Sequence, residues 1–283
     1  MTFTSPPATH SAIFRGDRRG FVEYREYVDF IKEAMGQQSQ NITFVQLSQG
    51  QMKKNKKSVV LRHDVDHDLD MAVNMAKIEG AAGLKSTYFL LPDHVSNKTG
   101  RIYFDYTEKF LTKCYQIRDA GQDIALHNNF LTTHIKTGQP LRAIIDKPLN
   151  FLRSNGIEIL GTACHGDPLC YTKNYYNYEV WTEFDPEATE QRSRGEYPSV
   201  PFSEFGFIYE SYFSEYDYYV SDSGGSFRGA DFTGTSKKLF ERAIKHPDIN
   251  IGLEAINKFK LSTNNSHIIQ ILTHPCWWGL YKK

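Results

Sequence analysis

From residue 58 onward, short apolar segments alternate with longer segments in which apolar residues recur every three or four positions. The first pattern is typical of buried strands, and the second of helices that cover a sheet. A repeated strand-then-helix order predicts parallel strands with right-handed crossovers, in a barrel or in an open doubly wound sheet. The expected strands are 59–63, 86–91, 123–127, 157–163, 206–210, 216–220 and 267–273, and the expected helices are 69–82, 107–120, 141–154 and 236–245.

The chain before this alternating pattern is predicted to be an N-terminal extension, residues 1–57, to one domain at 58–283. Within the extension we expect a helix at 24–35, because its apolar residues fall on one face, and an edge strand at 42–47. The basic run at 53–57 is interpreted as a solvated loop, with a phosphate or polymer contact as the alternative.

Composition narrows the class of protein. The chain has 283 residues, of which 40% are hydrophobic, enough for a full core. Lysine plus arginine (33) balance aspartate plus glutamate (33), which gives no reason to expect a nucleic-acid partner. No apolar run is long enough for a membrane span, the first residues lack the features of a signal peptide, and the four cysteines form no CxxC pair. We therefore expect a cytoplasmic protein.

Residues 58–70 change from an apolar run into a series of acids and imidazoles, His-Asp-Val-Asp-His-Asp, and then become helical. Asp68 or Asp70 is expected to cap the helix. Such a crowded strand end is poor material for a core and good material for a metal or proton-transfer site.

Polar side chains of this kind follow five of the expected strands. They are Asp64 and Asp66, His127, His165 and Asp167, Asp222, and His274. Because parallel strands bring their carboxyl ends to one edge of a sheet, these side chains can converge there. Imidazole with carboxylate is a ligand set that zinc and first-row divalent metals favour.

Each of these residues also has a structural interpretation. The two acids of the first strand could cap the following helix. His127 could be a core histidine bonded to a backbone carbonyl, His165 could order a Gly-Asp turn, and His274 could be a strand-end histidine. Asp222, before Ser-Gly-Gly, could be a turn residue. The cysteines near this edge are interpreted as small packed residues, and a zinc knot of Cys164, His165 and Cys170 lacks a usual spacing.

Residues 58–275 resemble the polysaccharide deacetylase family, also called NodB-like or carbohydrate esterase family 4. The first motif resembles His63-Asp-Val-Asp66, the second Ile124-Ala-Leu-His127, and the last Leu272-Thr-His274. The resemblance implies a distorted (β/α)7-type barrel that removes acetyl groups from sugars with a divalent metal. It implies that Asp64 is the general base, Asp66 a metal ligand, and His274 the general acid.

The chain departs from the family pattern at three points. Val65 separates the two acids that are usually adjacent, and Leu131 stands where the second histidine of His-x-x-x-His is expected. The arginine and prolines of the third motif are replaced by Cys-His-Gly-Asp-Pro at 164–168. For the missing ligand we predict His165, because it ends a strand, with His134 as the second choice.

The resulting prediction is a deacetylase of an N- or O-acetylated sugar or oligosaccharide, in a divergent branch of the family associated with surface polysaccharides. Its metal would be Zn²⁺ or a similar divalent ion, held by Asp66, His127 and His165, and Asp222 would orient a catalytic group. Asp167, Trp277 and Trp278 are the expected substrate-binding residues. The aromatics of 171–184 could stack on sugars or pack under loops. The alternatives are an amidohydrolase acting on a non-sugar C–N bond and a degenerate barrel that only binds glycans.

Overall fold

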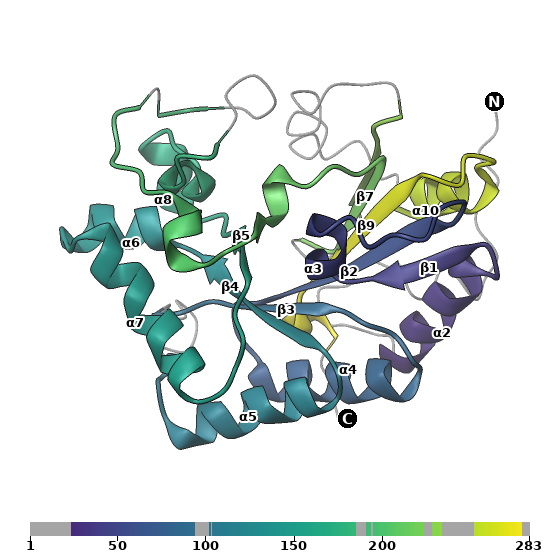
Figure 1. Ribbon diagram of the computed structural model, residues 1–283, viewed down its shortest axis with the longest axis horizontal. Coiled ribbons are helices and arrows are strands. Elements are labelled where there is room, and N and C mark those ends of the chain that lie inside the picture. Colours follow the sequence, from purple (N-terminus) through teal and green to yellow (C-terminus); the bar gives the residue numbers. More distant parts are fainter. Residues whose placement is uncertain are drawn as a thin grey trace.

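The computed structural model describes residues 24–93, 102, 104–184, 191–193, 195–223, 228–233 and 252–278. Figure 1 shows a curled sheet with helices along its outside, so that the described strands form half of a barrel. The α/β class and the parallel sheet are confirmed. The predicted helix at 236–245 lies outside the described residues.

The sheet has nine described strands in the order β6-β5-β4-β3-β2-β9-β7-β8, with β1 beside β2. Their bounds are β1 Ser39–Ile42, β2 Lys57–Val65, β3 Thr87–Leu90, β4 Asp123–Asn128, β5 Gly161–Cys164, β6 Tyr209–Glu210, β7 Tyr218–Ser221, β8 Arg228–Asp231 and β9 Ile268–Thr273. The pairing of β7 with β8 is antiparallel, and the other strand pairs are parallel. Strand β2 therefore lies centrally, with β9 on one edge and β1 and then β3 on the other.

The helices begin and end where local chemistry favours it. Their bounds are α2 Tyr24–Met35, α3 Phe44–Ser48, α4 Leu69–Ala81, α5 Glu108–Asp119, α6 Phe130–Thr137, α7 Leu141–Ser154, α8 Pro168–Thr172 and α10 Gly252–Leu261. Asp68 and Thr107 accept hydrogen bonds from the first turns of α4 and α5, as N-caps do. Gly121, after α5, has a positive φ of 85°, which glycine adopts without strain.

The two faces of the sheet have different environments, because successive strand residues point to opposite sides. Val59, Leu61 and Val65 of β2 belong to the large core under helices α2, α4, α5 and α7. Val60 belongs to a smaller inner cluster, in which Phe44 of α3 contacts Phe89 and Tyr209. This apolar cluster fills the inner face toward the amino ends of the strands, so that polar residues are left for the carboxyl ends.

Several expected elements need correction. The strand predicted at 42–47 is wrong, because Thr43 caps helix α3 with a reciprocal bond to Gln46, and β1 ends at Ile42. Lys57 is not part of a solvated loop but begins β2, where its ammonium group donates to three carbonyls at the end of α10. The strand predicted from 157 begins only at Gly161.

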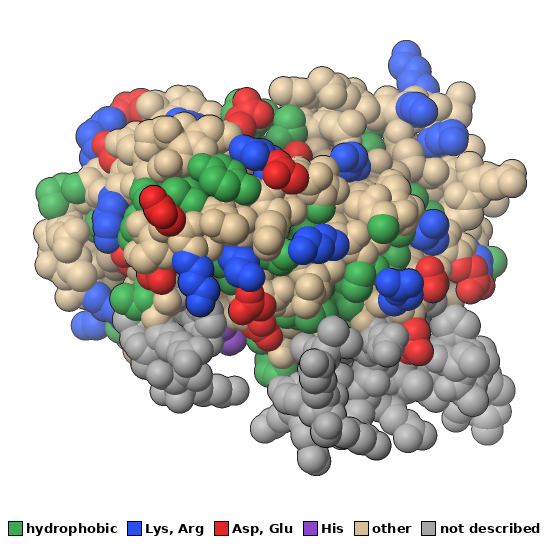
Figure 2. All heavy atoms as spheres, turned by 90° about the horizontal axis from the view of Figure 1, so that it is seen from below, with side chains coloured by type: hydrophobic (Ala, Val, Ile, Leu, Met, Phe, Trp, Pro, Cys, Tyr) green, Lys and Arg blue, Asp and Glu red, His purple; other side chains and the backbone are tan. Residues whose placement is uncertain are grey.

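The surface carries no single dominant charge on the face seen in Figure 2, where basic and acidic side chains are interspersed. Among the helices of the described part of the chain, none is both long and apolar enough to cross a membrane.

Candidate metal centre

Asp66, His127 and His165 come together at the carboxyl edge of the sheet. One ligand atom from each residue lies within 4.8 Å of the other two. Asp66 directly follows β2, His127 is in β4, and His165 directly follows β5, so three parallel strands deliver them to one place. The rings of the two histidines are nearly perpendicular, with centroids 5.0 Å apart. This group is the arrangement that the strand-end pattern predicted.

Backbone contacts fix the two histidines. His127 Nδ1 lies 2.7 Å from the Ala163 carbonyl, which only accepts, so Nδ1 carries a proton and Nε2 is the nitrogen left to bind a metal. The backbone N–H of His165 donates to the Asn128 carbonyl, and Asn177 donates to the His165 carbonyl. Such supporting bonds are typical around metal-ligating histidines.

Asp66 fits a cation well. Its Oδ1 is buried and has no hydrogen-bond partner among the described residues, while His127 Nε2 lies 3.4 Å away. Burial alone would raise the pKa of Asp66, but His165, His127 and His274 outweigh burial and lower it. A carboxylate and two imidazoles, each of which binds a metal through an unprotonated nitrogen, can hold a divalent ion with positions left for water or substrate. The residues present therefore fit a metal ion.

Asp64 lies beside this group on the inner face of β2. Arg62, two residues earlier on the same face, donates from Nε and Nη2 to the two carboxylate oxygens, both at 2.7 Å. His127 Nε2 is 3.3 Å from Asp64 Oδ2. Burial would raise the pKa of Asp64, but Arg62 and His127 lower it to about 2. The carboxylate is thus held ionised and oriented between the arginine and the candidate metal ligands.

Asp222 and His274 form a second pair at the same edge, after β7 and β9. Asp222 Oδ1 lies 2.6 Å from His274 Nδ1, and Oδ2 accepts from the His274 backbone N–H. Burial would lower the pKa of His274, but Asp222 raises it to about 9, with Asp66 and Asp64 adding to the effect. The imidazole is therefore held protonated, with Nδ1 directed to Asp222.

Other candidates lie elsewhere. His134, the second choice for the third ligand, is in α6 and its Nδ1 lies 2.7 Å from the Gln139 carbonyl. Among the described residues, the group that could hold a metal consists of Asp66, His127 and His165. Cys164 and Cys170 are not in this group. Burial raises the pKa of both thiols, which opposes the thiolate form that binds zinc.

The predicted substrate-binding residues are mostly engaged in the structure. Asp167 caps helix α8 with one oxygen and contacts Lys136 with the other. Trp278 is 5% exposed and packs on Tyr24 and Tyr27, so its ring offers no face for a sugar, and that prediction is wrong. Trp277, half-buried against the core, stays a prediction.

The aromatic residues of 171–184 divide by burial. Tyr175, Tyr178 and Trp181 are buried, which fits packing rather than stacking on sugars. Tyr171, in contrast, is 68% exposed.

Arg62 and Glu79 are two of the buried charged residues that the sequence pattern did not single out. Arg62 is two residues before Asp64, the spacing that puts both side chains on one face of a strand. Glu79 lies three residues after Ala76 and seven after Ala72, on the apolar stripe of α4, and it is fully buried. A charge on a core-facing stripe was the available signal for Glu79, and the same-face spacing was the signal for Arg62.

Comparison with known proteins adds no relative. No protein-family model matches the chain, and no curated protein is similar enough to count as a match.

Proposed function

We propose that this protein is a metal-dependent hydrolase that removes acetyl from an N- or O-acetylated sugar. The observation that carries the proposal is the meeting of Asp66, His127 and His165 within 4.8 Å, at the edge where Asp64 also lies. Two imidazoles and one carboxylate suit Zn²⁺ or a similar first-row ion. Such an ion, when bound, polarises a carbonyl and acidifies a coordinated water.

Asp64 is the proposed general base. At neutral pH it is ionised, because the Arg62 contacts and His127 lower its pKa to about 2. The same contacts make Asp64 a weak base. Its contribution is a carboxylate that is already ionised and oriented to accept the proton of the attacking water. Positioned acid–base groups typically contribute about 10²- to 10⁴-fold to a rate.

His274 is the proposed general acid. Asp222 holds Nδ1 at 2.6 Å, so the remaining nitrogen, Nε2, is the one that can give a proton to the leaving amine or hydroxyl. As the carbon–nitrogen or carbon–oxygen bond breaks, that proton completes the sugar product, and the acyl part leaves as acetate. The raised pKa of His274, about 9, keeps the proton in place until it is needed.

The choice of an acetylated sugar is supported by the motif resemblance to NodB-like deacetylases. The order of the matching residues along the chain, Asp64 and Asp66, then His127, then His274, follows the order of that family's motifs. The half-barrel of parallel strands is consistent with the distorted barrel that the resemblance implies. His165 takes the place of the missing second histidine in the proposed ligand set.

The test begins with metal analysis of the purified protein. We expect about one equivalent of metal in the wild type, and loss of that metal in Asp66→Ala and His127→Ala. His134→Ala is the control, because that histidine lies elsewhere in α6. Stoichiometric metal that survives both ligand substitutions would show the ligand assignment to be wrong.

Activity is then measured as acetate release from a panel of N- and O-acetylated sugars and non-sugar amides. We expect release from at least one sugar, abolished in Asp64→Asn with metal retained. Release from the non-sugar amides alone would favour the amidohydrolase alternative. Sugar binding by metal-free protein without turnover would favour the binding module.

A further inference from the structure

Trp278 lies directly behind the Asp222–His274 pair. Its indole Nε1 donates to Asp222 Oδ2 at 2.7 Å. The same carboxylate therefore receives the imidazole Nδ1–H on one oxygen, and the His274 backbone N–H and the indole N–H on the other. Three donors from two residues fix the plane of a buried carboxylate, since rotation about its χ2 would break them together.

Helix α2 supports this tryptophan. The ring of Tyr24 meets the indole edge-on at 5.5 Å, and the ring of Tyr27 lies 4.7 Å from it. Both tyrosines are almost fully buried, and they come from the segment before the parallel strands. Aromatic pairs of this kind contribute beyond the area they bury, so α2 limits the positions that the indole can adopt.

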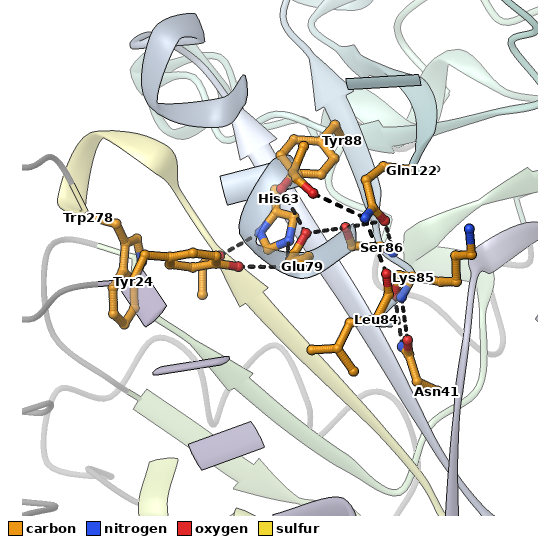
Figure 3. A network of polar contacts seen from close by, with 12 residues as sticks. Tyr24, Asn41, His63, Glu79, Leu84, Lys85, Ser86, Tyr88, Gln122 and Trp278 are labelled. Carbon is orange, nitrogen blue, oxygen red and sulfur yellow. Dashed lines mark hydrogen bonds and ion pairs between the residues drawn. The ribbon is translucent and has the colours of Figure 1, made fainter. Parts of the chain in front are cut away.

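Tyr24 is itself held from the other side, as Figure 3 shows. Its hydroxyl donates to Glu79 Oε1, and Glu79 also contacts His63 Nε2 at 2.8 Å. His63 Nδ1 reaches Thr273 Oγ1, in the residue before His274. A continuous set of buried contacts thus connects α2, α4, β2 and β9 beneath the candidate acid.

We infer that Trp278 is a positioning residue for the general acid, and that α2 of the N-terminal segment is a structural part of the site because it supports this indole. The inference rests on the proposed function. Trp278 acts through Asp222, to which its indole N–H donates and whose orientation determines which nitrogen of His274 is available. The indole N–H, rather than ring volume alone, is the group that does this.

The test compares Trp278→Phe with the wild type. Phenylalanine keeps an aromatic ring against Tyr24 and Tyr27 and removes the N–H. We expect kcat to fall by about 10- to 100-fold, as for loss of a hydrogen bond to a charged group, with KM and metal content unchanged. Tyr27→Leu, which removes one supporting ring, should give a smaller fall in kcat with the same unchanged KM.

Trp181→Phe is the matched control. Trp181 is buried, as Trp278 is, and donates its indole N–H to the buried Glu210 rather than to Asp222. The two variants should lose comparable stability, and Trp181→Phe should keep wild-type kcat. If kcat fell in both variants, the positioning role of Trp278 would be overturned. The same would follow if kcat fell in neither variant while the wild type was active and held its metal.

A readout without catalysis separates this inference from the proposed function. With ¹⁵N-labelled tryptophan, the three indoles give three N–H signals, and Trp278→Phe identifies one of them. We expect Asp222→Asn to shift that signal more than the other two. An unshifted signal contradicts the contact itself. A shifted signal in a protein that releases no acetate from any substrate overturns the proposed function, and the positioning role with it.

Discussion

Two buried carboxylate–imidazole clusters lie on opposite faces of strand β2, and they differ in how completely their polar atoms are satisfied. On the outer face, Glu79 receives hydrogen bonds or ion pairs from Tyr24, His63, Ser86 and Tyr88. On the inner face, Asp66 keeps a buried oxygen that has no hydrogen-bond partner among the described residues. Adjacent residues of one strand, His63 and Asp64, thus belong to clusters of different character.

The difference shows what marks a candidate site. Burial and charge are common to both clusters, so neither property identifies function here. In the outer cluster every contact ends on another protein group, and the result is a rigid connection between α2, α4 and three strands. In the inner cluster the geometry leaves an oxygen of Asp66 and the Nε2 atom of His127 for something else to bind. Incomplete coordination, rather than a buried charge, supports the metal proposal.

The largest expected effect comes from Asp66→Asn. The amide keeps the shape of the side chain but loses the charge, so metal affinity and acetate release should fall by about 100-fold or more, since even outer partners of a ligand cost 10- to 100-fold. Metal titration and acetate release measure this. The unfolding free energy of the metal-free protein should change less than in Glu79→Gln, because Asp66 completes no satisfied network.

Glu79→Gln is the matched change in the outer cluster, and its effect should fall on stability. The amide replaces one carboxylate oxygen, which now accepts from two of the four donors, with an NH2 group that is itself a donor. The loss of the carboxylate charge and of these buried contacts should cost about 3 kcal/mol. Urea unfolding of the metal-free protein checks the size. Metal content should remain at the wild-type value. If Glu79→Gln lost metal while keeping its stability, the assignment of stability to the outer cluster and metal binding to the inner cluster would be wrong.

Much of the fold could be predicted, because strand and helix periodicities are local. The helices at 24–35 and 141–154 match α2 and α7. The failures occur where tertiary contacts decide. Residues 157–160 are apolar enough for a strand, but β5 begins only at Gly161. Helix α6, which the sequence did not predict, begins without a side-chain cap hydrogen bond and so gives a weak start signal.

The site was predicted as far as topology determines it. Parallel strands bring Asp66, His127 and His165 to one edge whatever the details of their packing. Side-chain contacts that depend on tertiary packing could not be predicted from the strand and helix periodicity. Trp278 is one of two adjacent tryptophans that were expected to stack against sugar faces, yet it packs against Tyr27 of α2. That contact joins residues from opposite ends of the chain, which no periodicity can reveal.

The Asp222–His274 pair is intermediate between the two clusters, and pH can measure its contribution. Asp222 raises the pKa of His274 from its usual 6.5 to about 9. A raised folded pKa stabilises the protein fully below pH 6.5, and this stability is lost as pH rises through about 9. At about 1.36 kcal/mol per unit, the loss amounts to about 3 kcal/mol. Unfolding of metal-free protein across this range should show it, and Asp222→Asn should largely remove it.

The smallest expected effect, from Thr273→Val, tests whether the two clusters act separately. His63 Nε2 faces the Glu79 carboxylate and must carry a proton, so Nδ1 depends on Thr273 Oγ1, 2.6 Å away, for its partner. Valine keeps the volume and removes that partner, which should cost about 1 kcal/mol of unfolding free energy. Thr273 precedes His274, so a kcat assay gives the sharper result. Unchanged kcat with reduced stability would show that the His63–Thr273 contact only supports the fold, whereas a fall in kcat with metal retained would show that it also holds the general acid in position.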